Sequence, residues 1–500
     1  MTTRPRTAGH RAVLVLGALA ILASACTGPQ AKEPPKPGDG AAVCGNTQRG
    51  PARPPDNAVV VDPDIAGKLT TATQDNPAGT TFWLAPGTHI LGDGEYDQVA
   101  PKDGNTYLAA PGAILDGRET NRYAFTGKAA DVTITHLTVR NFVPPVNEGV
   151  VNHDSGARWT LEHNTFRDNS GAALMAGDKQ VMRGNCFKNN GQYGLNACCG
   201  DITDLVLERN EFVGNNTDDV EAANPGCGCT GAMKFWAIDG ADIIGNWIHD
   251  NRGPGIWADT NNNDFLIERN LIERNDGAAI IYETSYNAVI RDNLLRRNAW
   301  VTGREFAANS DNFPVATIYI SESGGEPRVP ARTDRIEIAR NTLENNWSGI
   351  TLWENADRFC NSAANTSTGA CTLLVDSVER CARPGIAKPP LYDDCRWKTQ
   401  RVEIHHNRFV LDPEVVGCRV LCARMAVLAN FGTFPDWSPY EGDVVREAIT
   451  HEQDNRWHDN DYRGPWTFLA FDTNTTITFT QWRAAPYQQD VGSSFAPVSE

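Results

Sequence analysis

The sequence predicts an all-β solenoid, and two observations lead to this fold class. The first is a motif in which an apolar residue, two further residues and Asn are followed by any residue, an apolar residue, two residues and Asn. It recurs with a base period near 23 residues, interrupted by insertions. The second is the strict alternation of apolar and polar residues in short runs such as Ile336-Glu337-Ile338, which is the period of a strand. The lead asparagines are Asn164, Asn185, Asn210, Asn246, Asn270, Asn293 and Asn341, with partial copies at Asn407 and Asn455.

A coil of about 23 residues has room for three short strands and three turns. Each run ends at Asn, often with Gly soon after, and these residue types tolerate left-handed backbone at a tight turn. Asparagines in register on successive coils can form a ladder of side-chain amides. The parallel strands of stacked coils lie about 4.8 Å apart. Leucine-rich repeats are the alternative solenoid, but their Leu-x-x-Leu-x-Leu frame is absent.

The Asn-rich coils resemble the right-handed parallel β-helix of the pectin-lyase-like superfamily, over roughly residues 57–480. The segments Phe82–His89 and Ala110–Gly117 are similar to the first coils of such proteins. The likeness is closest to uncharacterised secreted bacterial β-helix proteins, so it assigns no catalytic residue. The superfamily contains polysaccharide lyases, glycoside hydrolases, epimerases and non-catalytic surface proteins. The resemblance therefore implies the fold and does not choose among these functions.

The N-terminus is predicted to be a targeting segment, residues 1–25, with a basic start and an apolar run too short to span a bilayer. Ala23-Ser24-Ala25 fits a cleavage site for ordinary secretion. Small residues before Cys26 equally resemble a bacterial lipobox, which would make Cys26 the lipidated first residue. Residues 26–56 are Pro-rich and predict a stiff tether, and residues 481–500 a C-terminal tail. We expect an extracellular protein or a cell-surface lipoprotein.

The net charge limits the kinds of partner that the protein can bind, and the cysteine content indicates its redox compartment. The formal net charge of -17 argues against a nucleic-acid partner, and against a bare acidic polymer unless a cation reverses the local sign. Removing Cys26 from the 13 cysteines leaves an even number, which suits disulfides in an oxidising compartment. We expect a monomer in contact with a membrane only through a lipid anchor. The local disulfides predicted are Cys360–Cys371, Cys381–Cys395 and Cys418–Cys422.

Four carboxylates are predicted at one corresponding place on successive coils: Asp259, Glu283, Glu322 and Glu354. Three of them lie 13 residues after a lead Asn, and Glu322 ends the equivalent strand of a coil that carries an insertion. Neighbours in such a ladder lie about 5 Å apart. Because stacked carboxylates repel one another, some must be protonated or a cation must lie among them.

Both outcomes suit sugar chemistry. Carboxyls about 5 Å apart match a retaining glycosidase, and about 6.5–9.5 Å an inverting one. Alternatively, Ca²⁺ held by Asp259, Glu283 and Glu322 would neutralise a uronate while Lys234, on the preceding coil, acts as the base. The alternative without a function is a row of solvated acids at strand ends.

Insertions and aromatic residues surround this row. Residues 216–230 and 299–315 precede the relevant strand and residues 355–400 follow it, so loops on both sides would form the walls of a groove. Their acids Asp218, Asp219 and Glu221 are further candidate cation ligands, or simply a solvated loop. The aromatic residues of the same strands that could stack on sugars are Trp257, Tyr282, Tyr319 and Trp353. Because side chains alternate along a strand, about half of them are expected to point into the core instead.

Two histidine features are assigned no function. His249 occupies an outward, unspecialised place in its repeat and is predicted to lie on the surface. His405 and His406 are adjacent, and on a strand their side chains would point to opposite faces, which disfavours a shared metal. The sequence thus leaves two functions open: a polysaccharide lyase or glycoside hydrolase using the carboxylate row, or a non-catalytic glycan-binding or structural surface module.

Overall fold

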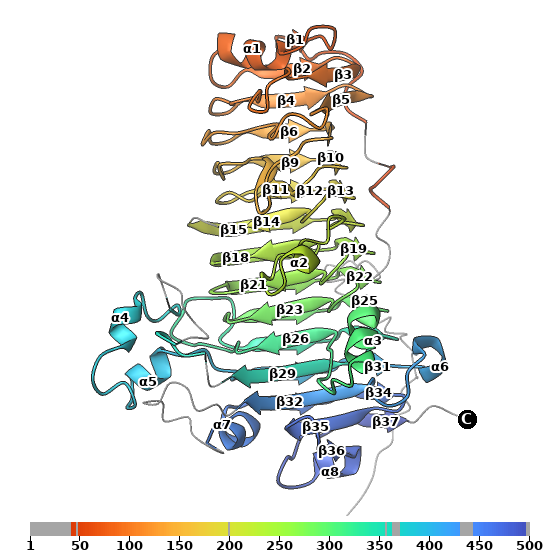
Figure 1. The fold of residues 1–500 in the computed structure, drawn as a ribbon, viewed down its shortest axis with the longest axis vertical. Helices are drawn as coiled ribbons and strands as arrows, with labels where there is room; N and C mark the ends of the chain where they lie inside the picture. The colour runs from red at the N-terminus through yellow and green to blue at the C-terminus, as the bar shows by residue number, and fades with distance from the viewer. Residues whose placement is uncertain are drawn as a thin grey trace, which may run out of the picture. The chain divides into compact units, whose positions relative to one another are not determined.

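The structure, a computed structural model, describes residues 42–46, 49–198, 201–355, 358–362, 371–430 and 444–496. The signal segment and Cys26 lie outside the described residues, so their assignment stays a prediction. The described residues after position 37 form one compact unit, a stack of coils whose strands build three sheets, the third of which begins at Gly149 (Figure 1). In the part of the chain that the structure describes, no helix is long and apolar enough to cross a membrane.

The first sheet has 13 parallel strands. They are β1 (Val59–Val61), β2 (Thr81–Leu84), β4 (Thr106–Ala109), β6 (Thr133–Thr135), β9 (Thr160–Glu162), β12 (Val181–Arg183), β15 (Ile202–Glu208), β18 (Ile238–Ile244), β21 (Asn263–Glu268), β24 (Ala288–Arg291), β27 (Ile336–Ala339), β30 (Val402–His405) and β33 (Arg456–His458).

The second sheet also has 13 parallel strands. They are β3 (Gly87–Ile90), β5 (Ala113–Asp116), β7 (Thr138–Arg140), β10 (Thr165–Arg167), β13 (Cys186–Lys188), β16 (Glu211–Val213), β19 (Trp247–His249), β22 (Leu271–Glu273), β25 (Leu294–Arg296), β28 (Thr342–Glu344), β31 (Arg408–Val410), β34 (Asp461–Arg463) and β37 (Ser494–Ala496).

The third sheet has 11 strands, parallel except for the last pair. They are β8 (Gly149–Val151), β11 (Ala172–Met175), β14 (Leu195–Ala197), β17 (Met233–Phe235), β20 (Ile256–Ala258), β23 (Ile280–Glu283), β26 (Ile318–Ser321), β29 (Ile350–Asn355), β32 (Arg424–Asn430), β35 (Thr467–Phe471) and β36 (Thr476–Ile477).

Short helices lie between the strands. They are α1 (Lys68–Asp75), α2 (Val220–Ala223), α3 (Trp300–Ala308), α4 (Val378–Cys381), α5 (Leu391–Asp394), α6 (Pro413–Val416), α7 (Val444–Glu447), a π-helical turn (Ala448–Glu452) and α8 (Phe479–Arg483). The three predicted insertions carry α2, α3 and the pair α4 and α5.

The predicted parallel β-helix is confirmed, and its interior is built as the period-2 pattern requires. In one coil Leu161, Phe166 and Leu174, from the three sheets, are fully buried and point into the same core. Corresponding residues stack from coil to coil, as in the aromatic column of Phe166, Phe187 and Phe212. Each coil therefore buries its apolar face against the next.

The asparagines of the repeat form two buried amide ladders, as predicted. In each ladder the Nδ2 of one Asn donates to the Oδ1 of the next, at 2.9–3.2 Å in the first and 2.8–3.0 Å in the second. The first ladder runs through Asn164, Asn185, Asn210, Asn246, Asn270, Asn293, Asn341, Asn407 and Asn460.

Two details of the repeat differ from the prediction. The left-handed residue is the one before the lead Asn, such as Arg269 at φ 54° or His406 at φ 55°. In the last copy it is Asn460, five residues after Asn455, that stacks on the ladder. Since Asn460 bonds to Asp490 and Ser493, the stack continues past residue 480 into β37. Asp490 and Ser493 replace the expected asparagines, which is why the repeat motif does not detect this coil.

Residues 42–58, here called the N-terminal strap, run along the outside of the solenoid, with 47–48 outside the described residues (Figure 1). Cys44 is disulfide-bonded to Cys186 of β13. Further along the strap, Pro51 accepts a hydrogen bond from Trp83 Nε1 at 3.1 Å. Gly50 lies so close to Ala109 that a Cβ would stand 1.9 Å from its carbonyl oxygen. The described part of the predicted tether is thus docked on the coils.

The local disulfide predictions are confirmed in two of three cases. Cys381–Cys395 and Cys418–Cys422 are bonded. The predicted Cys360–Cys371 pair is wrong, because both residues are free thiols buried in the third insertion. There the sulfur of Cys360 lies close to those of Cys381 and Cys395, which are bonded to each other.

Candidate functional site

The candidate site lies on the outward face of the third sheet, over β17, β20, β23 and β26. Strand pairing aligns Lys234, Trp257, Ile281 and Tyr319 in one outward column. Two residues further along the strands, Asp259 and Glu283 share the next outward place, because Ala258 pairs with Tyr282. The parallel β-helix therefore brings together residues that lie on separate coils.

Lys234 and Asp259 form an ion pair across this face. The Lys234 ammonium lies 3.0 Å from Asp259 Oδ2, and the two side chains are 12% and 14% exposed. The same ammonium stands 3.6 Å from the centre of the Trp257 ring and donates to the carbonyl of Gly228 at 2.5 Å. Because Trp257 Nε1 also donates to Glu283 Oε2 at 3.0 Å, one indole connects the lysine to the second carboxylate.

A second cation, Arg358 of the third insertion, completes the cluster. Its Nη2 donates to Glu283 Oε1 at 2.8 Å, and its Nε lies 3.6 Å from Glu322 Oε1. Arg358 was not predicted, since it lies in an insertion outside the repeat. We call Lys234, Asp259, Glu283, Glu322 and Arg358 the groove cluster.

Two carboxyls of the groove cluster, Glu283 and Glu322, have raised pKa values. Burial raises the pKa of Glu322 to about 8, against the opposing effect of Arg358 and with the help of the negative charge of Glu283. Burial and the neighbouring Asp259 also raise the pKa of Glu283, although Arg358 and Trp257 favour its ionised form. Repulsion in the row is thus relieved by two protein cations and by raised pKa values of Glu283 and Glu322, which favour their protonated forms.

The predicted equal register is found for Asp259 and Glu283 but not for the other two acids. Ser321 pairs with Glu283 and Trp353 with Ser321, so Glu322 and Glu354 lie one residue further along their strands. The third strand begins five residues after Asn275 but only four after Asn346, because one turn is a residue shorter.

Glu354 does not face the groove. It is fully buried, forms an ion pair with Arg396, and accepts hydrogen bonds from the Thr399 amide at 2.8 Å and Gln453 Nε2 at 2.7 Å. These partners come from the end of the third insertion and from a later coil. The prediction that Glu354 is a catalytic acid is corrected: it anchors an insertion to the solenoid.

Of the aromatic residues predicted to stack on sugars, some line the groove and others do not. Tyr282 is a core residue, fully buried with its hydroxyl donating to the Tyr286 carbonyl at 2.6 Å, so the prediction that it stacks on a sugar is wrong. Trp257 and Tyr319 line the groove as predicted. Trp353 is half-buried and packs edge-on against Phe313, with ring centres 5.7 Å apart.

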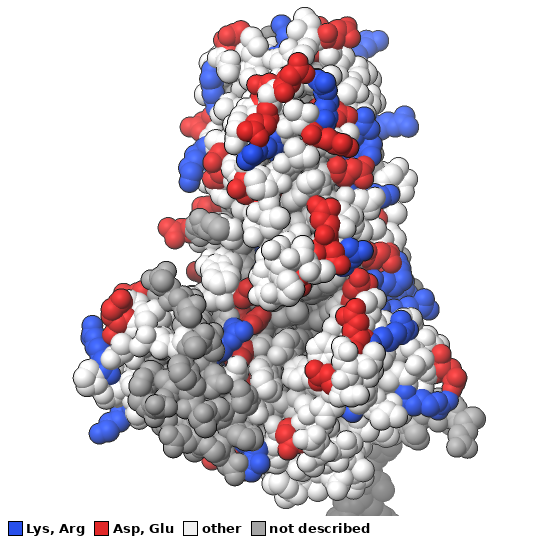
Figure 2. All heavy atoms as spheres, viewed as in Figure 1, with Lys and Arg blue, Asp and Glu red and all other residues white. Residues whose placement is uncertain are grey.

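The groove beside the cluster has a volume of about 660 Å³. Its floor is formed by Trp257, Ile281 and Tyr319, and the α2 and α3 insertions form its walls. In Figure 2 this face is hollowed next to α3, with charged side chains along the hollow. Its lining acids outnumber its single cation, Arg252: Asp219, Glu221, Asp276 and Glu305.

The groove cluster does not fit a Ca²⁺ site. Its oxygens are engaged by Lys234, Arg358 and Trp257, and among the described residues Asp259, Glu283 and Glu322 do not converge to within 4.8 Å of one another. Glu221 of the first insertion accepts from the amides of Gly226 and Cys229 instead and so shapes its own loop. Ca²⁺ stays a prediction of the sequence, and no step below depends on it.

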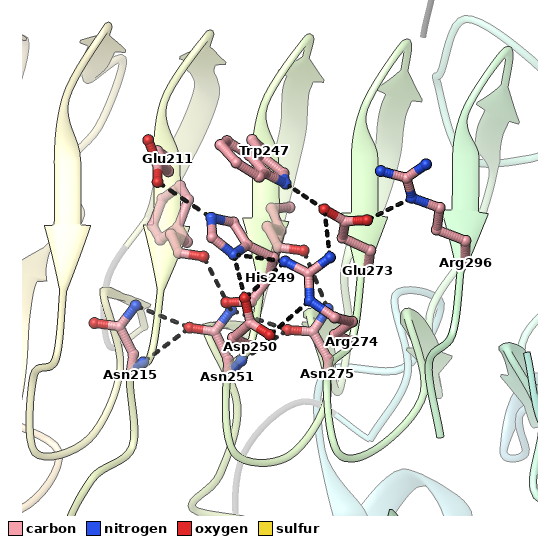
Figure 3. A network of polar contacts seen from close by, with 12 residues as sticks. Glu211, Asn215, Trp247, His249, Asp250, Asn251, Glu273, Arg274, Asn275 and Arg296 are labelled. Carbon is pink, nitrogen blue, oxygen red and sulfur yellow. Dashed lines mark hydrogen bonds and ion pairs between the residues drawn. The ribbon is translucent and has the colours of Figure 1, made fainter. Parts of the chain in front are cut away.

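A second polar network crosses the outside of the second sheet (Figure 3). His249 is only 6% exposed, so the prediction that it lies on the surface is wrong. Its Nε2 lies 3.1 Å from Glu211 Oε1, and its Nδ1 lies 2.6 Å from Asp250 Oδ2. Glu211 also accepts from the amide of Cys44 at 2.7 Å, so this network holds the N-terminal strap against the coils.

The network continues through paired charges on the next coils (Figure 3). Arg274 binds Asp250 and Glu273, each at 2.8 Å, and Arg296 forms a further ion pair with Glu273. Against the effect of burial, the two arginines lower the pKa of Glu273. Trp247 Nε1 donates to the same carboxylate at 3.0 Å. Because each charge here has a partner, this network has a structural role.

Comparison with known proteins agrees with the architecture. The family model described as the right handed beta helix region matches residues 126–232, 148–325 and 225–363. These matches agree with the right-handed parallel β-helix described above. No curated protein matches the sequence.

Several solved structures are similar over much of the chain. A mannuronic acid specific polysaccharide family 6 lyase from human gut microbiota is 10% identical, with a TM-score of 0.47, covering 89% of this chain and 92% of its own. The A-module of the Azotobacter vinelandii mannuronan C-5 epimerase AlgE6 is 10% identical, with a TM-score of 0.44 and coverages of 89% and 99%. The corresponding module of AlgE4 is 13% identical, with a TM-score of 0.38 and coverages of 71% and 94%.

Proposed function

We propose that the protein hydrolyses glycosidic bonds of a neutral polysaccharide bound along the groove. The observation that carries this proposal is the asymmetry of two adjacent carboxyls: Asp259 is paired with Lys234, whereas the pKa of Glu283 is raised. Environments that push neighbouring acids apart in this way are the usual basis for assigning a general acid and its ionised partner.

In this mechanism the raised pKa makes Glu283 the general acid, which donates a proton to the glycosidic oxygen. Asp259, paired with Lys234, attacks the anomeric carbon and forms a glycosyl ester as the leaving sugar departs. Water then attacks the ester, and Glu283 takes up its proton. Because adjacent parallel strands lie about 4.8 Å apart, the two carboxyls suit the separation of about 5–5.5 Å found in retaining enzymes.

The surroundings favour a neutral chain. The groove is lined by more acids than bases and the whole protein has a formal net charge of -17, so a polyanion would be repelled. Trp257 and Tyr319 on the floor offer flat apolar surfaces to sugar rings. A groove across parallel strands, open to solvent between insertions, suits an extended polymer.

The test is a panel of neutral and uronic polysaccharides assayed for new reducing ends, with wild type, Glu283→Gln and Asp259→Asn. We expect each variant to lose at least about 10-fold in activity, about 1.4 kcal/mol in transition-state stabilisation. Asp242→Asn is the matched control, since Asp242 lies on the first sheet and binds Arg332. Retention of activity by Glu283→Gln on a substrate that wild type cleaves would place the chemistry elsewhere.

A second candidate, a lyase acting on a uronate polymer, is favoured by one observation. Two cations, Lys234 and Arg358, lie in the same cluster, and β-elimination needs a base and a group that neutralises the uronate carboxylate. A lyase yields an unsaturated product that absorbs in the ultraviolet, whereas a hydrolase does not. The same panel read in both ways separates the two reactions, and binding without turnover would support the non-catalytic module.

We also propose that the chain is exported to an oxidising compartment. The bonded cysteine pairs, including Cys44–Cys186 across 142 residues, support this location, since such bonds are rare in reducing cytosol. Mass spectrometry of the mature N-terminus from the native host tests it. A lipid on Cys26 identifies an anchored protein, and a free N-terminus near this position identifies a secreted one.

A further inference from the structure

A histidine cluster lies far along the chain from the groove cluster, at the turns that leave the first sheet. His405 ends β30 and His458 ends β33, and strand pairing places them opposite each other. Their rings are parallel, with centres 5.0 Å apart. Each is followed by a left-handed residue, His406 at φ 55° and Asp459 at φ 53°. The repeat thus places two equivalent dipeptides on neighbouring coils.

The left-handed residue corrects the prediction for the adjacent histidines. In a continuous strand His405 and His406 would point to opposite faces, but the turn at His406 brings their Nδ1 atoms to 2.8 Å. On the next coil, Nδ1 of His458 lies 2.8 Å from Asp459 Oδ2. Two imidazole nitrogens at that distance must share a hydrogen or face a common cation.

The other nitrogen of each strand histidine is held by a carboxylate. Nε2 of His458 lies 3.1 Å from Glu403 Oε1, and Nε2 of His405 lies 3.5 Å from Glu337 Oε1. Metal-binding histidines are commonly oriented by a carboxylate on the nitrogen that does not bind the metal. This arrangement leaves Nδ1 of His458 beside Asp459 and Nδ1 of His405 beside His406.

We propose that His406, His458 and Asp459 bind a divalent transition-metal ion, for which Zn²⁺ is the chemical type, with His405 as a neighbouring donor. One donor atom from each of the three residues lies within 4.8 Å of the others. Imidazole nitrogen with one carboxylate oxygen is a donor set suited to Zn²⁺. His406 and Asp459 are exposed, so an ion can enter from solvent and keep a water ligand.

A metal here would join the turn after β30 to the turn after β33. The two turns lie on neighbouring coils near the C-terminal end of the stack. The ion would therefore connect residues that are about 50 positions apart in the sequence. Binding to the native state alone raises stability in proportion to the logarithm of metal concentration. The bound ion would therefore stabilise the C-terminal end of the solenoid. This role does not depend on any reaction in the groove.

The test is Zn²⁺ titration of the metal-stripped full-length protein by calorimetry, without a polyhistidine tag because the tag binds the same ions. We expect one ion per chain and a rise in melting temperature on its addition. His458→Ala and Asp459→Asn should each weaken binding at least about 10-fold, and Glu403→Gln about 10-fold through loss of orientation. Asp459 is exposed, so its variant is expected to fold.

The matched control is His163→Ala, in another pair of neighbouring histidines, His136 and His163, whose ring centres lie 5.3 Å apart. It should leave the stoichiometry, affinity and melting shift unchanged. Wild type that binds no Zn²⁺ at micromolar concentration overturns the proposal. So does equal binding by wild type and His458→Ala, or a loss of binding in His163→Ala as large as in His458→Ala.

Discussion

Glu322 is a buried carboxyl, and its burial in the folded protein changes its pKa. Its ordinary pKa of 4.5 is raised to about 8, chiefly by burial. The neighbouring Arg358 only partly compensates, with its Nε 3.6 Å away. Up to about pH 8 the native protein therefore keeps a proton that the unfolded chain releases.

This difference sets the sign of a pH dependence. Between about pH 4.5 and 8 the unfolded state binds fewer protons than the native state, so the contribution of Glu322 to stability falls as pH rises and is constant above that range. We expect Glu322→Gln to remove this decline, of about 1.4 kcal/mol per pH unit, and to be more stable than wild type near pH 8.

Urea unfolding of both proteins at several pH values measures the effect. The free energy difference between variant and wild type should grow toward alkaline pH. Glu344→Gln, at a half-buried position at the end of β28, is the control for replacing a glutamate outside the groove cluster. A difference that stays constant from pH 5 to 8 would mean that Glu322 is ionised in the native state.

At the scale of the element, the asparagine ladder is the repeated set of hydrogen bonds that holds successive coils together. Asn270 is buried and its Nδ2 donates to the Ile243 carbonyl at 2.8 Å and to Asn293 Oδ1 at 3.0 Å. Its own Oδ1 accepts from both the amide and the side chain of Asn246. One side chain thus satisfies polar groups on both neighbouring coils and connects three coils in all.

Asn270→Ala should therefore destabilise the protein by about 3 kcal/mol, since it leaves several buried groups without partners. Denaturant unfolding gives the value directly. Asn309→Ala, at the exposed end of α3, removes the same amide without breaking the ladder and should change stability by less than about 0.5 kcal/mol. Similar losses in both variants would show that the ladder adds little.

The elements also explain how much the sequence could predict. Stacked coils and amide ladders were predictable because every coil repeats the same spacing. The same counting correctly placed Asp259 beside Glu283. It failed for Glu354, where one turn is a residue shorter and a buried arginine is supplied by an insertion. Arg358 could not be predicted at all, because insertions follow no repeat and their contacts depend on their path in space.

At the scale of the whole molecule, the Cys44–Cys186 bond closes the longest loop among the described disulfides, with a sequence separation of 142. In the chain-entropy view a loop of this size stabilises by roughly 4–5 kcal/mol, against about 2 kcal/mol for the four-residue separation of Cys418–Cys422. The strap disulfide should thus dominate the cysteine contribution to stability.

Paired serine substitutions test this ranking. Cys44→Ser/Cys186→Ser should lower the unfolding free energy more than Cys418→Ser/Cys422→Ser. The first pair should also expose residues 42–58 to limited proteolysis, because only the strap contacts then hold them. Equal losses of unfolding free energy in the two double variants would contradict the loop-entropy argument. They would indicate that packing contacts, rather than the disulfide, hold the strap.

The strap disulfide also fixes how the protein bears a mechanical load. Tension applied to the chain before Cys44 passes through the disulfide into β13 and bypasses residues 45–185. The first coils, from β1 to β12, are thus shielded from the pull and cannot be peeled off one by one from their end. Force enters instead at a strand bonded on both sides, to β10 and β16. Reducing the bond would redirect the load to β1, at the terminus of the stack, where unravelling can begin.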